Sequence, residues 1–579
     1  MAEREPGPAD DHPPCLRRPT SEEPAELGFV RRPMVRWLDP HQLADTAARV
    51  LVAGLFSSYA DNRELQAIVP AEVFDRSEGP ELWLDYVADL GDGWNSTYTV
   101  AGLLAAEELK LELDGETHAT RRGRILVMGG DQVYPVPKRT EYENRMLGPY
   151  RSALPCTTGD DPAPELFAIP GSHDWYDGLV NFTSIFCRHR WIGGWRTRQR
   201  RSYFALELPG GWWLWGIDIQ FGAYIDEAQV EYFAALARDR VAAGDRIVIC
   251  MAKEVDSGRS DAETHTDRDV DYLDREVIQP SGARLMLFLK SGKHHYARYA
   301  EEDGPRHHVT AGGGGAFLHP THGLPDRMKM TGAEGPTWYA KAATYPSEAT
   351  SKGLRKRIWL LPPYNLPLAG MFGLLQVVLA FMLGLHLDDS HVELGLEDLR
   401  RGLWESPTAF FLITVMLVLL AGMVRFAHDA SGFKRFLLGL VHSALQLASV
   451  AAVMVAASRL SSGVGLRGAW SLVVFLLFVG LLGGLGGTVG MSGYLYFTNC
   501  LGFHSNEGYA PLHHMDLKHF LRLHIAADGV LTVYPIGVDH VGRTWELRPD
   551  DPPGAPWFVP SSPIEPHLIE PPIRIDGRS

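Results

Sequence analysis

Cysteine is scarce in this sequence. The 579 residues contain only five cysteines, and no two of them form a CxxC pair. An odd number of scattered cysteines argues against a disulfide framework and against a zinc knuckle. The sequence therefore favours a protein of a reducing compartment. The five residues are Cys15, Cys156, Cys187, Cys250 and Cys500.

Positive charge is also in short supply. The chain has 55 Lys and Arg against 70 Asp and Glu, which gives a formal net charge of −15. Binding to nucleic-acid phosphates relies on clustered Lys and Arg, so the composition argues against a general nucleic-acid binder. The N-terminus lacks a basic start followed by an apolar core, and we predict no signal peptide. Its proline and acidic content predicts a flexible tail over residues 1–34.

Long apolar runs are absent from the first 350 residues and then become frequent. Four segments, 364–386, 408–427, 436–458 and 470–497, each approach the length of about 20 residues that crosses a bilayer. One such segment could be a buried helix of a soluble domain, but four in succession predict a four-helix transmembrane domain over residues 360–498. We expect the lipid bilayer to be a partner of the protein. We also expect that the protein could form homo-oligomers through these spans.

Glycines recur at a spacing of four in the last apolar segment, "GLLGGLGGTVG" at residues 480–490. This spacing allows two helices to approach closely. Flexible glycines in an apolar helix would give the same pattern, and the sequence does not separate these two interpretations.

Basic residues near the ends of the predicted spans indicate an orientation. Lysines and arginines cluster at 352–357 and at 425–435, whereas the other two connections hold fewer. Since cytoplasmic loops carry an excess of Lys and Arg, both soluble parts should face the cytoplasm. We therefore predict a multi-pass protein of the inner cell membrane, with a cytoplasmic C-terminal segment over residues 499–579.

Residues 35–350 alternate strand-like and helix-like segments. Residues 82–93 and 123–135 each read as an apolar strand that ends in a loop, and residues 96–109 between them read as a helix. Buried strands that alternate with helices predict an α/β layered domain. In such domains the catalytic groups gather at the carboxyl ends of the strands.

Aspartates and histidines follow several of these strands directly. One alone is usually a loop cap, but a series of them favours a site at one edge of a sheet. Carboxylates and imidazoles suit transition metals, and two such ions about 3.5–4 Å apart can clamp a phosphoryl group. The residues are Asp89, Asp131, His173, Asp174, His294 and His295.

The motifs "DLGDG", "GGDQVYP", "PGSHDWYDG" and "SGKHHYARY", in this order, resemble the calcineurin-like metallophosphoesterase superfamily. The similarity covers about residues 80–325 and is closest to a bacterial branch joined to a membrane domain. It implies a β-sandwich flanked by helices over residues 35–350, one or two Mn, Fe or Zn ions as cofactors, and a phosphate ester as substrate. We expect a small α+β tail after the membrane domain.

The resemblance also implies roles for individual residues. Asp89 would bind the first metal, Asp131 would bridge both metals, and Tyr134 matches a tyrosine ligand of the purple acid phosphatase branch. His294 would complete the first metal site. His173 and Asp174 occupy a turn where the histidine assists phosphate binding or protonates the leaving group. Arg298 could bind phosphate oxygens with both arms of its guanidinium.

Three departures from the family pattern fall on the second metal site. Ser172 stands where the family has an asparagine ligand, and Gly292 stands where it has a ligand in the final motif. Residues 248–258 contain no histidine. The second site could be weak, rebuilt from Glu254, Asp256 or His295, or absent.

Two functions of different classes follow. The first is a membrane-anchored phosphoesterase that hydrolyses a phosphate mono- or diester with metal-activated hydroxide. The second is a degenerate homologue that binds one metal or a phosphorylated ligand and acts as a sensor or scaffold.

An arginine-rich segment, "WIGGWRTRQRRSYF" at residues 191–204, stands apart from these motifs. It is either an exposed basic loop or a contact for anionic lipid headgroups or a phosphorylated substrate.

Overall fold

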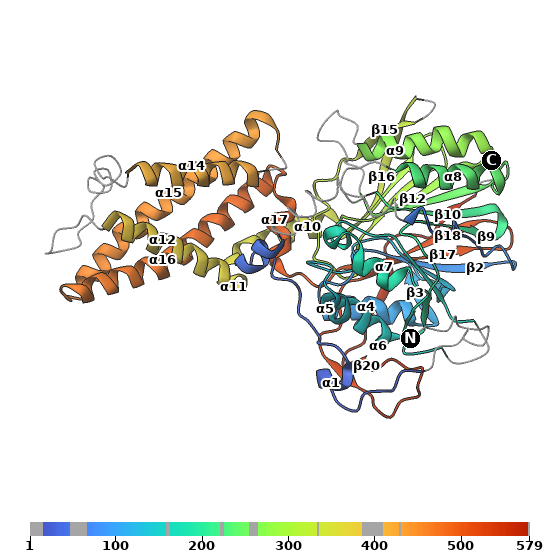
Figure 1. Cartoon of the computed structure of the whole chain (residues 1–579), viewed down its shortest axis with the longest axis horizontal. Helices are drawn as coiled ribbons and strands as arrows, with labels where there is room; N and C mark the ends of the chain where they lie inside the picture. Colours follow the sequence, from blue (N-terminus) through green and yellow to red (C-terminus); the bar gives the residue numbers. More distant parts are fainter. Residues whose placement is uncertain are drawn as a thin grey trace. The chain divides into compact units, whose positions relative to one another are not determined.

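The structure is a computed structural model that describes residues 15–46, 66–157, 162–219, 225–253, 265–332, 335–384, 409–427 and 430–576. The chain divides into two compact units (Figure 1). The larger unit comprises Met1–Val35, Thr46–Glu348 and His514–Ser579, and the smaller unit comprises Arg36–Asp45 and Ala349–His513. Glu254 and Asp256, which were candidate ligands of the second metal, lie outside the described residues, as does the connection between the first two predicted spans.

Two large sheets form the centre of the larger unit. The first sheet has the strand order β1 (Val73–Asp75), β9 (Phe204–Leu208), β10 (Trp212–Ile217), β11 (Arg246–Met251), β12 (Arg284–Lys290), β14 (His307–Ala311), β13 (Tyr296–Glu301), β16 (Gly335–Tyr345) and β15 (Arg327–Gly332). The second has the order β21 (Pro566–Leu568), β18 (Leu531–Val538), β17 (Lys518–Ile525), β2 (Leu82–Val87), β5 (Ile125–Met128), β6 (Glu165–Ala168), β8 (Trp195–Thr197) and β7 (Trp191–Ile192), with β22 (Ile573–Ile575) beside β18.

Side chains from both sheets share one apolar core. Leu84 and Leu523 of the second sheet pack in the same buried cluster as Leu206 and Val248 of the first. Strands β5, β6, β10 and β11 are buried along their whole length, as in the β10 sequence "WWLWGI". A continuous apolar run of this kind is typical of a strand that is covered on both faces.

Helices cover the outer faces of both sheets. Helices α4 (Trp94–Ala105), α6 (Gly148–Ala153) and α7 (Val180–Phe186) share a buried cluster with strands of the second sheet. Helices α8 (Glu227–Asp239) and α9 (His265–Leu273) share another with strands of the first sheet (Figure 1). The predicted α/β class is confirmed. Small hairpins β3 (Glu108–Leu113) with β4 (Glu116–Arg121) and β19 (Trp545–Leu547) with β20 (Phe558–Pro560) complete the unit.

The segment that follows the apolar helices belongs to the larger unit. Strand β17 pairs antiparallel with β2, with Leu521 opposite Tyr86, and so joins the centre of the second sheet. Arg522 is fully buried, and its Nε lies 3.1 Å from Asp85 Oδ1. The sequence predicted a small α+β tail in the segment over residues 499–579. Residues 514–576 belong to the larger unit, because the apolar faces of their strands are buried against strands more than 400 positions earlier.

The N-terminal segment also differs from the prediction of a flexible tail. In its described part, Leu27 and Phe29 are buried in the core of the larger unit. Cys15 and Cys156 form a disulfide, with Cα atoms 4.8 Å apart. The cysteine pattern did not indicate this pair, because only the fold brings together two residues separated by 141 positions. Arg18 donates to the carbonyls of four residues near the C-terminus: Arg548, Pro552, Ala555 and Pro556.

The smaller unit consists mainly of apolar helices: α12 (Leu366–Gly384), α14 (Ala409–Phe426), α15 (Gly432–Gly463) and α16 (Ala469–Cys500) (Figure 1). By length and composition, two described helices, α15 and α16, can cross a membrane. A bent pair, Glu348–Tyr364 with Leu366–Phe381, would add a third span. Two of the four predicted spans therefore meet this criterion in the described chain, and the four-span domain stays a prediction.

Glycines bring α12 and α16 together. A Cβ at Gly373 would lie 2.4 Å from the Gly480 carbonyl oxygen, and one at Gly484 would lie 2.7 Å from the Ala369 carbonyl oxygen. Both positions therefore need glycine for the two helix backbones to approach. The structure favours close helix packing over the alternative of flexible glycines.

Candidate metal centre

Two aspartates stand at the carboxyl ends of neighbouring parallel strands. Asp89 follows β2 and Asp131 follows β5, and the two turns bond to each other through Asp89 N to the Gly130 carbonyl at 3.0 Å. Both aspartates adopt left-handed backbone conformations, with φ of 56° and 50°. Such conformations cost free energy in non-glycine residues and cluster at functional sites. Here they direct both carboxylates to the same edge of the sheet.

Three polar side chains meet around the Tyr134 hydroxyl. This hydroxyl lies 3.0 Å from Asp89 Oδ1, 3.4 Å from Asp131 Oδ2 and 3.0 Å from His294 Nε2. His294 Nε2 lies 3.7 Å from Asp89 Oδ1. All four residues are buried. The structure thus brings together residues from three loops that span more than 200 positions of sequence.

Neighbouring carbonyl and imidazole groups fix the orientation of His294. Its Nδ1 lies 2.7 Å from the Phe317 carbonyl oxygen, which can only accept, so Nδ1 carries the hydrogen. Its backbone N–H donates to His319 Nδ1 at 2.9 Å. The lone pair of Nε2 therefore points toward Tyr134 and Asp89, which is the arrangement of a metal-ligating histidine held by an outer partner.

Two glycines make room for the carboxylates. A Cβ at Gly312 would lie 2.0 Å from Asp89 Oδ2, and one at Gly171 would lie 2.2 Å from Asp131 Oδ1. The Gly292 N–H donates to Asp89 Oδ2 at 3.0 Å. The glycine run that contains Gly312 is therefore explained by close packing against the site.

The electrostatics of the cluster favour a bound cation. Burial, with the neighbouring Asp131 carboxylate as the second cause, raises the pKa of Asp89 well above its usual range. Burial lowers the pKa of His294 well below its usual range, so the imidazole is neutral and able to donate a lone pair. In the described part of the chain, neither aspartate forms an ion pair with a lysine or arginine. A metal ion would supply the missing positive charge.

The donor set fits a metal ion when the phenol is included. Ligands at about 2.1 Å from one ion lie about 3 Å from each other at right angles, close to the distances around Tyr134. Within the residues that the structure describes, no three His, Cys, Asp or Glu side chains form such a group by themselves. Tyr134 is therefore the residue on which the fit depends.

His173 lies beside this cluster. Its backbone N–H donates to Asp131 Oδ1 at 2.8 Å, and its Nδ1 lies 2.8 Å from the Pro135 carbonyl oxygen. The imidazole is partly exposed, and its ring centroid lies 4.5 Å from that of Tyr134. The neighbouring Ser172 hydroxyl lies 3.5 Å from Asp131 Oδ2. The structure places His173 at the solvent-facing margin of the site.

Asp174 lies in the predicted turn directly after His173, and its side chain bonds inside the fold. It is fully buried, and its Oδ2 accepts from Gly171 N at 2.8 Å and from Gln132 N at 3.2 Å, while its Oδ1 accepts from Tyr142. Burial, and then the Asp131 charge, raise its pKa to about 8. These contacts make Asp174 a residue that positions the loop, and leave the predicted catalytic role without a contact that supports it.

Arg298 is engaged elsewhere. Its guanidinium bonds to both carboxylate oxygens of Glu570, at 2.8 Å and 2.5 Å. Glu570 also accepts from Tyr296. Arg298 therefore stabilises the C-terminal segment, and the predicted phosphate contact finds no support. The sequence could not show this, because Glu570 lies 272 residues away.

His295 is buried next to His294 in sequence, but the structure does not bring it into the cluster. In the described chain its Nδ1 has no hydrogen-bond partner. Burial lowers its pKa to about 3, and the Lys293 charge is the second cause. A second metal site rebuilt from His295 therefore stays a prediction.

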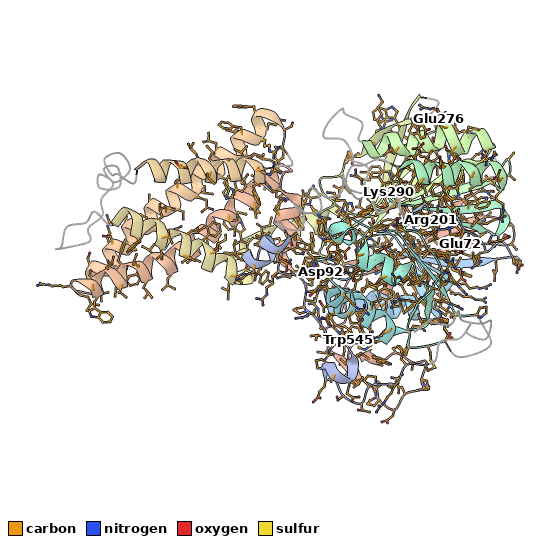
Figure 2. The ribbon with its side chains drawn as sticks, in the orientation of Figure 1. Glu72, Asp92, Arg201, Glu276, Lys290 and Trp545 are labelled. Carbon is orange, nitrogen blue, oxygen red and sulfur yellow. A yellow bond between two sulfur atoms is a disulfide. The ribbon has the colours of Figure 1, made fainter. Side chains whose placement is uncertain are left out.

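Sequence reasoning missed two buried residues near the cluster, Asp92 and Lys518. Asp92, which is labelled in Figure 2, lies in the larger unit. Its carboxylate accepts from Val35 N at 2.7 Å and from Phe317 N at 3.1 Å, and so holds the loop that orients His294. Burial lowers the pKa of Lys518 to about 8, while the Asp92 charge opposes this shift. The second aspartate of "DLGDG" was a signal for Asp92; nothing local pointed to Lys518.

Comparisons with known proteins give only distant likenesses. No protein-family model matches the chain, and no curated protein matches it. GAP50, the anchor in the inner membrane complex of Plasmodium, matches with a TM-score of 0.30 and 11% identity, over 46% of this chain and 80% of that one. Purple acid phosphatase PPD1 from yellow lupin matches with a TM-score of 0.26 and 12% identity, over 47% of this chain and 49% of that one. PhoD matches with a TM-score of 0.27 and 9% identity, over 48% of this chain and 70% of that one. Likenesses this distant carry no argument about the reaction.

Proposed function

We propose that this chain is a membrane-anchored, metal-dependent phosphoesterase of the calcineurin-like type that hydrolyses a phosphate mono- or diester. The observation that carries the proposal is the meeting of Asp89, Asp131 and His294 around the Tyr134 hydroxyl at one strand edge. Two strained aspartates, two close-approach glycines and a histidine of fixed tautomer all support this arrangement. A fold that needed only stability would have no use for two uncompensated buried carboxylates.

The residues of the cluster have distinct tasks in this proposal. Asp89, Asp131, Tyr134 and His294 would hold one transition metal ion, of the Mn, Fe or Zn class. Such an ion, when bound, supplies Lewis acidity and a nucleophile at neutral pH. Asp131 also accepts a hydrogen bond from the backbone N–H of His173. This bond fixes the position of His173 relative to the metal ligands. His173 would donate a proton to the leaving oxygen of the ester.

A second candidate is a sensor or scaffold that binds one metal or a phosphorylated ligand without turnover. The residues at the positions of the family's second-metal ligands favour this candidate, because they are poor metal ligands. Ser172 offers only a hydroxyl at 3.5 Å from Asp131 Oδ2, and Gly292 offers no side chain. The described part of the segment after β11 ends at Lys253 and provides no histidine.

Metal content and hydrolysis of the full-length protein in detergent test the proposal. Asp131→Asn removes one charge from the cluster, and Asp114→Asn makes the same change in the exposed turn between β3 and β4. We expect the wild type and Asp114→Asn to bind metal and to hydrolyse aryl phosphate mono- or diesters. Asp131→Asn should lose at least tenfold in activity and most of its metal.

The outcomes separate the two candidates. Bound metal together with hydrolysis supports the enzyme. Two equivalents of metal per chain would also support a functional second metal site. One equivalent without turnover supports the sensor. If Asp131→Asn equals Asp114→Asn in both metal content and activity, the cluster is not a metal centre. The phosphoesterase and the metal-binding sensor then both fail, and only a sensor that binds a phosphorylated ligand without metal is left.

The membrane orientation is a separate proposal. Basic residues near the predicted spans favour a cytoplasmic larger unit at the inner cell membrane. The Cys15–Cys156 disulfide opposes this, because disulfides persist in oxidising compartments. We expect a reporter fused after Ser579 to be cytoplasmic. A signal from outside the cytoplasm would reject the charge-based orientation and agree with the disulfide.

A further inference from the structure

The chain bends sharply just before the apolar helix α12. Helix α10 (Glu348–Leu354), a 3₁₀ segment (Arg355–Leu360) and helix α11 (Leu361–Tyr364) precede α12 in the chain (Figure 1). The chain direction changes by 61° at the break between Tyr364 and Leu366. A segment that leaves an apolar helix at such an angle can lie along a membrane surface instead of crossing it.

Asn365 holds this bend. The residue is buried, and its backbone N–H donates to the Leu361 carbonyl oxygen at 3.0 Å. Its side-chain Nδ2 donates to the same carbonyl at 3.1 Å and to the Pro511 carbonyl oxygen at 3.3 Å. One buried amide therefore joins the end of α11 to a distant segment of the helical unit, and the bend is a built feature of the fold.

The segment before the bend has one covered side and one uncovered side. Ile358 and Leu361 are buried in one cluster with residues of α16. The exposed side carries large apolar and aromatic side chains next to helices that can cross a membrane. Such a surface is expected to face lipid. The exposed residues are Trp359 at 48%, Leu360 at 41% and Tyr364 at 42%.

Trp359 lies near the end of α16. Its ring centroid lies 5.7 Å from that of Tyr496, and a Cβ at Gly493 would lie 3.3 Å from the Trp359 ring. The Arg355 guanidinium lies 5.7 Å from the same Tyr496 ring. Tryptophan, tyrosine and arginine thus meet a few residues before α16 ends at Cys500. Trp and Tyr gather at this level of membrane helices, where the headgroups begin.

Three basic side chains stand at the start of the same segment. Lys352 and Lys356 are exposed, and Arg355 is half-buried. Within the residues that the structure describes, none of the three forms an ion pair with a carboxylate. Glu507, the one acidic residue of the described chain between positions 349 and 513, lies 3.6 Å from His504 Nδ1. The three cations are therefore available to a ligand outside the chain.

We infer that this basic and aromatic surface binds the headgroup of an anionic phospholipid of the bilayer. Basic side chains close to a membrane attract anionic lipids, and aromatic side chains beside them insert at the level of the headgroups. The bend places both kinds of side chain directly before an apolar helix. The inference does not rest on the candidate metal centre. The surface consists of Lys352, Arg355, Lys356, Trp359, Leu360 and Tyr364.

Lipid binding to the full-length protein in detergent tests the inference. Native mass spectrometry measures the binding of phosphatidylglycerol and of phosphatidylcholine with the same acyl chains. Each basic side chain at an anionic surface raises the affinity roughly fivefold, so Lys352→Gln with Lys356→Gln should weaken phosphatidylglycerol binding about 25-fold. Lys110→Gln with Lys329→Gln removes two charges from exposed positions of the larger unit and should leave this binding unchanged.

Three results decide the inference. A preference for phosphatidylglycerol that is lost in the pair of changes at 352 and 356, and kept when both lysines become arginine, supports it. Equal binding of the two lipids by the wild type overturns it, as does equal behaviour of the two glutamine pairs. Displacement of phosphatidylglycerol by glycerol phosphate at the same concentration would show that the surface recognises a soluble phosphate, and the lipid would then be the wrong ligand.

Discussion

Arg522→Met is the most direct test of how the segment after the apolar helices completes the larger unit. Arg522 is fully buried, and its Nε lies 3.1 Å from Asp85 Oδ1. Its other nitrogens donate to the carbonyls of Thr120 at 3.2 Å, Leu103 at 3.2 Å and Ala106 at 3.0 Å. Methionine fills a similar volume but satisfies none of these groups.

The magnitude follows from the unpaired carboxylate. Removing one partner of a buried ion pair costs about 3–5 kcal/mol. An unfolding entropy of about 2.1 cal/mol/K per residue over roughly 400 residues gives about 0.8 kcal/mol/K, so the melting temperature should fall by roughly 4–6 °C. Thermal unfolding of the full-length protein in detergent, followed by near-UV circular dichroism, measures this change.

The loss should also depend on pH. Burial raises the pKa of Asp85 even with Arg522 in place. When the pKa of a carboxyl group is higher in the folded state than in the unfolded state, the protein loses stability as the pH rises from the unfolded-state pKa to the folded-state pKa. The substitution removes the opposing positive charge and raises the folded pKa further. The difference from wild type should therefore be larger at pH 8 than at pH 5.

A matched change on the surface provides the control. Arg574→Met alters an exposed arginine on β22 of the same sheet and should change stability by less than about 0.5 kcal/mol. Adding Asp85→Asn to Arg522→Met should recover part of the loss, because no buried charge is left alone. Equal melting temperatures for the two single variants would refute the pairing of β17 with β2 through a buried ion pair.

Three further outcomes are expected. Cys15→Ser should lower the stability of the larger unit by up to about 5 kcal/mol, since the disulfide closes a loop of 141 residues, and an unchanged melting temperature would contradict the bond. Gly312→Ala should abolish metal binding, because its Cβ would lie 2.0 Å from a carboxylate oxygen of the candidate centre, whereas Gly323→Ala, with no atom within 4 Å, should bind metal normally. Gly373→Leu should destabilise the helical unit in detergent, because the backbone of α16 lies 2.4 Å from the added Cβ. Gly370→Leu, which has open space around it, should not. Equal stability of the two variants would argue against close helix packing.

Much of the candidate centre was predictable from local sequence. Asp89, Asp131 and His294 each follow a run of apolar residues, and the order of the motifs indicated that their strands share a sheet. Tyr134 was identified through the resemblance of its motif to that of the purple acid phosphatase branch. These positions were accessible because a strand followed by a tight turn is encoded by consecutive residues.

The roles of other residues were not predictable in the same way. Asp174 sits next to His173, but its oxygens bond inward to Gly171 and Gln132. Arg298 lies in the last motif, but Glu570 binds its guanidinium. Sequence spacing gives the position of a residue along the chain, whereas the direction of a side chain depends on which partners surround it.

The sequence by itself determined the local order: which segments are apolar strands, which are apolar helices, and where polar residues interrupt them. These features depend on the burial preferences of neighbouring residues, which a periodic pattern records. Only the tertiary structure decided that β17 lies beside β2, that Cys15 meets Cys156, and that Trp359 lies beside Tyr496. Such pairings join segments tens to hundreds of residues apart, and the chain selects them by the free energy of the whole packed unit, which no single stretch of sequence contains.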